Sequence, residues 1–296
     1  MASSNSLPPS VASWQRAGSY VDFRGRQIYI QRHVTDGPPT VFLHGFPSSS
    51  YDWRALLDEL PDCNALLFDF LGFGLSDKPR DHKYTLAWQA DLVEELVLRE
   101  FGDQPVFLIA HDMGTSVTTE LMARELAGTQ RINTAGVLLF NGSILLNLAT
   151  PVLGQRLLRS RLGGFFARLT SQPVFRAQFG SVFSEEHPLT PSEASDHWAL
   201  ATFNGGHRLG HKLIHYMDER DRFTERWHGA VRDWVGDLHF AWGMLDPVAN
   251  TDVLAGLRAL RPSAPVTELA RLGHYPQIED PAVMARIVAG ASAAGK

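Results

Sequence analysis

Short apolar runs alternate with longer segments of helical spacing through most of the chain. Six runs are apolar enough to be buried strands: PTVFLHGF, NALLFDF, QPVFLIA, TAGVLLF, DLHFAWG and APVTELA. Residues 19–34 read as a strand pair around a turn at Gly25, and a helix is expected over 114–127. This alternation predicts an α/β fold with a mostly parallel central sheet flanked by helices.

The alternation stops after the fourth of these runs. Residues 142–233 are rich in Phe, Arg and His at helical spacing, and they show no strand-helix-strand pattern. Such a segment is typical of a helical insertion rather than of further sheet. We therefore expect a core domain formed by residues 1–141 and 234–296, with a helical cap, or lid, over 142–233.

Composition and charge exclude several classes of function. The 296 residues are 44% hydrophobic, which is enough for a sizeable core. The formal net charge of −5 gives no overall basic excess for nucleic acid or an anionic membrane surface. The lone cysteine, Cys63, excludes an internal disulfide framework. Because the amino terminus lacks the features of a secretory signal, a cytoplasmic location is expected.

One uncharged stretch, residues 135–155, is about long enough to cross a bilayer. Asn141, Gly142, Asn147 and Pro151 interrupt it. Because a membrane span needs an unbroken apolar run, we expect a short strand, a loop and a new segment here, and no membrane span.

Four motifs follow the expected strands, at the edge where ligands gather in open α/β sheets. In chain order they are HGFP at 44–47, DFLGFGLSD at 69–77, the turn AHDMG around Asp112, and a late pair formed by Asp246 and His274. The turn resembles the strand-turn-helix elbow that carries the nucleophile of serine esterases, with an aspartate at its centre.

An aspartate at that point predicts alkyl transfer. It is ionised at neutral pH, so it can attack an sp³ carbon without a base and form an ester. His274 is the natural base for the water that hydrolyses this ester, and Asp246 the group that orients its imidazole. The backbone N–H groups of Phe46 and Met113 are expected to hold the developing oxyanion.

These motifs, with the phrases DFLGFGLSDKPR, LDPV and HYPQIEDP, resemble the aspartate-nucleophile branch of the α/β-hydrolase superfamily over nearly the whole chain. Within that branch the chain is similar to epoxide hydrolases, and most of all to the mesoderm-specific transcript proteins and their bacterial relatives. Some relatives place the orienting acid one strand earlier, but that position offers only Asn141 here, which favours Asp246.

The resemblance implies an epoxide hydrolase that needs no cofactor and opens a small, mostly apolar epoxide to a diol. Related epoxide hydrolases use two tyrosines of the lid as proton donors. Tyr216 stands where the second is expected, whereas the stretch GGFFARLTSQPVFRAQF offers phenylalanines in place of the first. His44 and Pro47 are expected to support the oxyanion loop.

Two other functions remain open from the sequence. A haloalkane or haloacid dehalogenase would use the same ester chemistry. However, Met113 and Phe46 stand where haloalkane dehalogenases carry halide donors, and the arginines that follow the nucleophile in fluoroacetate dehalogenases are absent. The fold could also serve as a ligand-binding module without turnover, which the intact set of Asp112, Asp246 and His274 disfavours.

Three histidines, His207, His211 and His215, share one helix face and suggest a zinc site, but no nearby carboxylate or cysteine completes it. No metal is therefore expected. The predicted partner is a small molecule, an epoxide or an organohalide, and a homodimer is left open.

Overall fold

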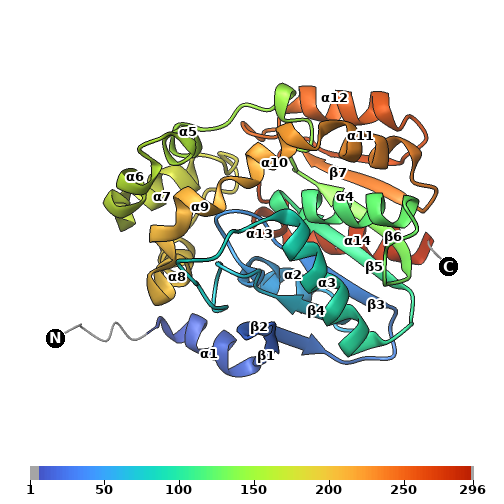
Figure 1. The fold of residues 1–296 in the computed structure, drawn as a ribbon, viewed down its shortest axis with the longest axis horizontal. Helices are drawn as coiled ribbons and strands as arrows, with labels where there is room; N and C mark the ends of the chain where they lie inside the picture. Colours follow the sequence, from blue (N-terminus) through green and yellow to red (C-terminus); the bar gives the residue numbers. More distant parts are fainter. Residues whose placement is uncertain (1–6, 295–296) are drawn as a thin grey trace.

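The computed structural model describes residues 7–294 and contains one eight-stranded sheet (Figure 1). Its strands lie in the order β1-β2-β4-β3-β5-β6-β7-β8. Strands β3 to β8 are parallel, and β1 and β2 form an antiparallel hairpin whose second strand runs antiparallel to β4. The strands are β1 (Ser19–Phe23), β2 (Arg26–His33), β3 (Pro39–Leu43), β4 (Asn64–Phe68), β5 (Val106–His111), β6 (Thr134–Phe140), β7 (Leu238–Gly243) and β8 (Val266–Leu269). Every strand expected from the sequence is present, and the predicted fold is confirmed.

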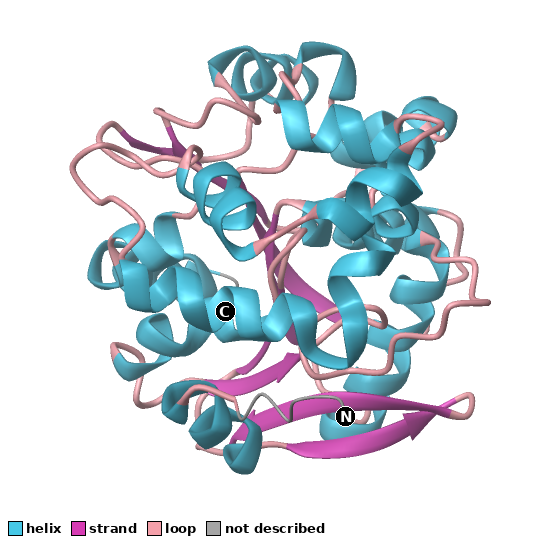
Figure 2. Cartoon of the chain, turned by 90° about the vertical axis from the view of Figure 1, so that its left-hand side faces the viewer, coloured by secondary structure: helices cyan, strands magenta, loops and turns pink. Residues whose placement is uncertain are grey.

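Helices cover both faces of this sheet, so that it lies inside the molecule (Figures 1 and 2). One face is covered by α3 (Leu86–Phe101), α4 (Met113–Leu126), α11 (Thr224–Asp233) and α12 (Thr251–Leu260). The other face is covered by α1 (Pro9–Ala17), α2 (Arg54–Asp58) and α14 (Pro281–Ala294). The short helices η1 (Ser50–Trp53) and α13 (Pro276–Glu279) lie in the connections after β3 and β8.

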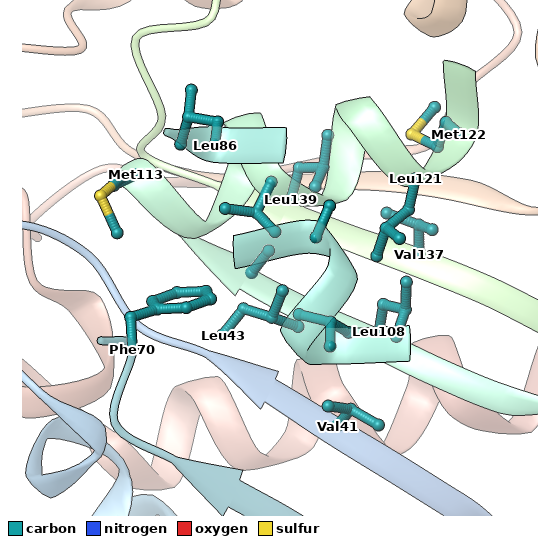
Figure 3. Packing of buried hydrophobic residues seen from close by; sticks show 14 of the residues in the cluster. Val41, Leu43, Phe70, Leu86, Leu108, Met113, Leu121, Met122, Val137 and Leu139 are labelled. Atoms are coloured by element: carbon teal, nitrogen blue, oxygen red, sulfur yellow. The ribbon is translucent and has the colours of Figure 1, made fainter. Parts of the chain in front are cut away.

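The two-residue period of the strands divides the core into two layers. In β3, Val41 and Leu43 belong to the layer beneath α3 and α4, whereas Phe42 belongs to the opposite layer. Figure 3 shows part of the first layer, in which Leu121 of α4 lies over the sheet. Because parallel strands are buried on both faces, their sequences are continuous apolar runs, which is why they could be recognised.

Polar residues at the ends of helices fix where several of them begin. The side chain of Thr85 accepts a hydrogen bond from the N–H of Trp88 at the start of α3. Asn250 does the same for the first turn of α12. Gly102 ends α3 with φ of 59°, a left-handed conformation that a glycine adopts without strain.

The segment 142–233 is helical, and most of it lies at the end of the molecule shown on the left of Figure 1. Its helices are η2 (Leu146–Leu148), α5 (Leu153–Arg159), α6 (Gly163–Leu169), α7 (Gln172–Gly180), α8 (Pro191–Thr202), η3 (Phe203–Leu209), α9 (Gly210–Leu213), α10 (Tyr216–Arg222) and α11. The last helix, α11, packs against α4 of the core. The part available to cover the site is therefore shorter than the whole insertion.

The uncharged stretch 135–155 forms most of β6, a loop, η2 and the start of α5. Within residues 7–294, no helix combines the length and the apolar character needed to cross a membrane.

A buried hydrogen bond fastens α11 to α4. The indole Nε1 of Trp227 donates to Oε2 of Glu120 at 2.9 Å, and the guanidinium of Arg226 binds the same carboxylate. Burial opposes ionisation of Glu120, but these hydrogen bonds outweigh it and lower its pKa. The carboxylate is therefore held in its charged form.

We predict that Trp227→Phe lowers the free energy of unfolding more than Trp53→Phe. Both indoles are buried, but Nε1 of Trp53 has no hydrogen-bond partner among residues 7–294, so its variant tests packing alone. The extra loss should be about 1.5–3 kcal/mol, the contribution of a hydrogen bond to a charged group. Urea unfolding followed by circular dichroism measures the difference, and equal losses would show that the bond to Glu120 contributes nothing.

Candidate active site

Asp112 lies at the tip of a sharp turn between β5 and α4. Its backbone has φ of 44° and ψ of −109°, a conformation that side-chain-bearing residues rarely adopt. Its carbonyl oxygen accepts hydrogen bonds from Thr115 Oγ1 at 2.6 Å, from Thr115 N at 3.1 Å and from Arg220 Nη2 at 3.1 Å. These bonds hold the strained turn in place.

Two glycines let neighbouring chain segments approach the turn closely. A Cβ atom on Gly45 would lie 2.6 Å from Cβ of Asp112, and one on Gly114 would lie 2.4 Å from the carbonyl oxygen of Leu43. Neither distance is compatible with a side chain. The glycine of HGFP and the glycine of HDMG are therefore required because neighbouring atoms leave no room for a side chain at either position.

The carboxylate of Asp112 is buried, and only one of its oxygens is hydrogen-bonded. Oδ2 accepts from the backbone N–H of Phe46 at 2.8 Å. Oδ1 has no hydrogen-bond partner within the described part of the chain, and the nearest cationic atom is Arg220 Nη2 at 3.8 Å. A buried carboxylate oxygen without a hydrogen-bond partner is costly for stability, and it is the form in which a carboxylate acts as a nucleophile.

His274 and Asp246 form the pair expected from the sequence. His274 Nδ1 lies 2.6 Å from Oδ2 of Asp246, and both residues are buried. The other oxygen of Asp246 accepts from the N–H groups of Val248 and Ala249. Asn141, at the end of β6, donates from Nδ2 to Asp246 Oδ2 at 2.8 Å. The residue at the alternative acid position thus binds the acid itself.

The charges around His274 favour its protonated form. Burial lowers its pKa, but the charge and hydrogen bond of Asp246, together with the charge of Asp112, outweigh burial and raise the pKa above the ordinary value. The imidazole is therefore a stronger base than a free histidine, and it stays protonated to a higher pH.

A second histidine, His111, supports the first and was not recognised from the sequence. Its Nε2 lies 2.7 Å from the carbonyl oxygen of His274, and its Nδ1 lies 3.2 Å from the amide nitrogen of Gln277. Burial, and then the charge of His274, hold the pKa of His111 well below its ordinary value. A neutral His111 that donates from Nε2 and accepts at Nδ1 satisfies both contacts.

The two residues whose N–H groups are expected to form an oxyanion hole lie in the HGFP loop and at the start of α4. The N–H of Phe46 donates to Asp112 Oδ2, and Met113, which follows Asp112, is the first residue of α4 (Figure 3). His44 is buried: its Nδ1 lies 2.9 Å from the carbonyl oxygen of Gly45, and its Nε2 accepts from the N–H of Phe70. The peptide bond before Pro47 is cis. The imidazole thus ties the loop to the segment after β4.

Arg220 is a further buried residue of the site that the sequence did not reveal. It belongs to α10, yet its Nε donates to Ser116 Oγ of α4 at 2.8 Å, and Nη2 reaches the carbonyl of Asp112. Its guanidinium also lies 4.6 Å from the ring centre of Tyr216. Because 104 residues separate Arg220 from Ser116, no local pattern could have indicated this contact.

Two buried tyrosines, Tyr216 and Tyr275, contact Phe46. Tyr216 begins α10 and is buried, with its ring centre 5.9 Å from that of Phe46. Tyr275 follows His274, and its hydroxyl lies 3.4 Å from the carbonyl oxygen of Phe46. Burial raises the pKa of both phenols, and the charge of Asp112 adds to the shift, so both keep their protons. Tyr275 was not recognised from the sequence.

A cavity of about 280 Å³ lies between this site and the cap. The core contributes Phe46, Pro47, His274 and Tyr275 to its wall, and the cap helices contribute mostly aliphatic and phenylalanine side chains. Tyr216 and Asp112 lie behind this wall, where each contacts Phe46. The cap side of the wall includes Val152, Leu157, Leu158, Phe166, Leu169, Val174, Phe175, Phe179, Val182 and Leu213.

The ammonium of Lys78 lies in the wall and is already hydrogen-bonded within the protein. Lys78 gives its ammonium protons to the carbonyl oxygens of Phe73, Gly74 and Ser76. Burial lowers the pKa of Lys78 to about 8, with the charges of Asp69 and Asp77 acting against it. No arginine of the described residues lines the cavity. The wall therefore favours an uncharged, apolar ligand.

The histidines that suggested zinc do not form a metal site. Within residues 7–294, no group of three or more His, Cys, Asp or Glu side chains is arranged to hold a metal ion. His207 lies in the cavity wall, and Nδ1 of His215 is hydrogen-bonded to the carboxylate of Asp218.

The fold and this elbow define a class, and comparison with known families agrees. Residues 38–281 match the family described as the alpha/beta hydrolase fold, so the chain belongs to that family. It is 49% identical over 273 residues to the Mycobacterium tuberculosis protein named "Putative hydrolase LipZ", covering 92% of this chain and 94% of that protein. It is 36% identical to mouse mesoderm-specific transcript protein, over 93% of this chain and 85% of that protein.

Two more distant proteins broaden this picture. The chain is 27% identical to cis-3-alkyl-4-alkyloxetan-2-one decarboxylase of Xanthomonas campestris, over 83% of this chain and 85% of that protein. The crystal structure of haloalkane dehalogenase DbeA from Bradyrhizobium elkani has a TM-score of 0.78 and 21% identity, with 94% of this chain and 98% of that chain covered. The latter likeness shows the shared fold alone.

We predict that the pKa of His274 falls when Asp246 is replaced by asparagine. Asn keeps the size of the side chain but removes the charge that opposes burial, so burial then dominates and disfavours the imidazolium. As the pH falls, a step that needs neutral His274 should therefore slow at a higher pH in the wild type than in the variant. ¹⁵N-histidine NMR titration measures both values, and identical values would show that Asp246 does not set the charge of His274.

Proposed function

We propose that the protein is an epoxide hydrolase that opens an apolar epoxide to a vicinal diol through an ester on Asp112. The observation that carries this proposal is the carboxylate of Asp112, whose Oδ1 is buried without a hydrogen-bond partner in the described part of the protein. It lies at a strained elbow close to a His274–Asp246 pair. A serine at that point would serve acyl transfer, whereas a carboxylate serves attack at an sp³ carbon.

In the first step, Oδ1 of Asp112 attacks one ring carbon of the epoxide. A carbon–oxygen bond to the enzyme forms, the ring carbon–oxygen bond breaks, and its electron pair leaves with the ring oxygen as an alkoxide. Tyr216 is proposed to give its proton to this alkoxide. Its raised pKa suits the role, because the phenol stays protonated until a strong base appears beside it.

In the second step, His274 takes a proton from water, and the oxygen of that water attacks the ester carbonyl carbon. The N–H groups of Phe46 and Met113 stabilise the oxyanion that develops there. The intermediate then collapses, the diol oxygen leaves from the carboxylate, and the imidazolium returns the proton. Asp246 holds the ring and stabilises its positive charge throughout.

A dehalogenase is the alternative with the same first step, and the site gives it less support. Displacement of a halide requires donors for the leaving anion, whereas the side chains of Phe46 and Met113 donate no hydrogen bonds. A haloacid would also need a cation for its carboxylate. The ammonium of Lys78 is already bound by three carbonyl oxygens.

A second candidate substrate is a four-membered lactone with alkyl chains, as named for the Xanthomonas relative. Like an epoxide, it is an uncharged strained ring, and the aliphatic cavity wall suits its alkyl chains. Carbon dioxide release in place of a diol would identify this reaction.

We predict that His274→Gln accumulates a covalent adduct with a turned-over epoxide. Asp112 needs no base to attack, but its ester needs His274 for hydrolysis, so alkylation should proceed and stop there. Intact-protein mass spectrometry should show an increase equal to the whole substrate, and peptide mapping should place it on Asp112. A haloalkane adduct would lack the halogen. Asp112→Asn is the matched control and should remain unmodified.

Isotope labelling in the wild type tests the same ester independently. In a single turnover in ¹⁸O-water with enzyme in excess, the diol should be largely unlabelled and the label should enter Asp112. Labelled diol with unlabelled enzyme would mean direct attack of water on the epoxide. That result would overturn Asp112 as the nucleophile.

We predict that Tyr216→Phe slows alkylation of Asp112 by about 10²–10⁴-fold, the usual contribution of a positioned acid, and leaves ester hydrolysis nearly unchanged. Tyr275→Phe is the matched control, because it also removes a buried phenol hydroxyl next to Phe46. Stopped-flow and rapid-quench measurements separate the two steps. A larger loss of alkylation in Tyr275→Phe would assign the proton donor to Tyr275.

A further inference from the structure

Charge is distributed unevenly along the chain. Residues 132–184 contain five of its 27 Lys and Arg residues and none of its 32 Asp and Glu residues. All five are arginines: Arg156, Arg159, Arg161, Arg168 and Arg176. This segment therefore carries a charge of +5 in a protein whose net charge is −5. The segment begins with β6 and η2, but its five arginines all lie in α5, α6, α7 and their connections, at the left-hand end of the molecule in Figure 1.

Four of these arginines are exposed and lack acidic partners within the described residues. Arg159 pairs with Asp218 and Asp221 of α10. No carboxylate among the residues that the structure describes forms an ion pair with the other four arginines of the segment. Most of the positive charge of α5 to α7 is therefore free to meet an anionic surface.

The same helices expose large apolar side chains. Leu162, Phe165 and Leu169 are 64%, 58% and 59% exposed, and Leu153 and Val174 are exposed as well. Half of the large apolar residues exposed by the described chain thus belong to α5, α6, α7 and their connections. A cluster of this kind marks a surface that meets an apolar partner.

Helix α6 shows how the two kinds of residue are combined. Leu162, Phe165 and Leu169 follow an i, i+3, i+7 spacing, which places them on one helix face. Gly163 and Ala167 occupy the opposite, buried side. Arg161, just before the helix, and Arg168 are both exposed and lie along the same flank of this apolar face. Outward-facing apolar side chains bordered by arginines are typical of helices that lie in a membrane interface.

The exposed apolar residues are continuous with the cavity of the site. Leu169 and Val174 are exposed at the surface and also belong to the cavity wall. A surface that enters lipid at these residues would give an apolar substrate a path from the bilayer to the cavity without passing through water. This continuity favours a lipid surface over a protein or nucleic acid partner.

We propose that α5, α6 and α7 form a docking face for an anionic lipid bilayer. Leu162 and Phe165 enter the interface, and Arg156, Arg161, Arg168 and Arg176 contact the lipid headgroups. The proposal concerns binding and does not depend on Asp112 chemistry, so it stands or fails separately from the proposed reaction.

Co-sedimentation with vesicles tests the docking face on the full chain. We expect binding to vesicles of equal parts phosphatidylcholine and phosphatidylglycerol, and little binding to phosphatidylcholine alone. Binding should weaken steeply in about 1 M salt, where the Debye length is about 3 Å. Each of Arg161→Gln and Arg168→Gln should weaken it about fivefold, as expected for loss of one basic residue near an anionic surface. Leu162→Gln and Phe165→Gln should weaken it as well.

Matched controls lie elsewhere on the surface. Arg16→Gln and Val235→Gln change an exposed arginine and an exposed valine outside α5 to α7 and should leave vesicle binding unchanged. Thermal unfolding checks that all variants are folded. The proposal would be overturned if the wild type did not bind anionic vesicles. It would also be overturned if the α6 variants bound as well as the controls. Sedimentation equilibrium showing a dimer that Phe165→Gln dissociates would overturn it too, because the face would then join two copies.

Discussion

The site depends on one constraint, which is the placing of a carboxylate on a strained backbone inside the protein. A conformation such as that of Asp112 costs on the order of 1–3 kcal/mol and persists only where surrounding contacts enforce it. Here the contacts are the hydrogen bonds to the Asp112 carbonyl and the close approach permitted by Gly45 and Gly114. The same contacts fix the start of α4 and the N–H of Phe46 that donates to Asp112 Oδ2.

Burial of this charge determines the character of its neighbours. Two further buried imidazoles, those of His44 and His111, have pKa values that burial lowers, which favours their neutral forms. Asn141 places an amide where a carboxylate would add a second negative charge beside Asp246. Of the groups packed around the site, His274 is thus the one whose titration the negative charges favour. Among these three buried imidazoles, His274 alone has a pKa raised above its ordinary value, because burial lowers the pKa of His44 and His111.

The core was predictable from the sequence because each part of it is encoded locally. Buried parallel strands are continuous apolar runs, and the motifs that follow them lie at one edge of the sheet by topology alone. The pairing of Asp246 with His274 followed from this rule. Arg220, His111 and Tyr275 were missed because their roles come from packing between elements. Arg220 reaches Asp112 from a cap helix, and a helical pattern does not state which core residue a cap side chain will meet.

The end of the cap is a second feature that the helical pattern of the sequence does not predict. Helix α11 follows the cap without a break in helical spacing, yet Trp227 and Arg226 attach it to Glu120 of the core. What distinguishes α11 from α6 is the environment of its apolar side chains: Trp227 is buried, whereas Phe165 faces outward. Net charge misleads for a related reason, since a sum over the whole chain hides a segment with arginines and no carboxylates. Local charge and exposure, read together, therefore define the surface of the cap better than composition does.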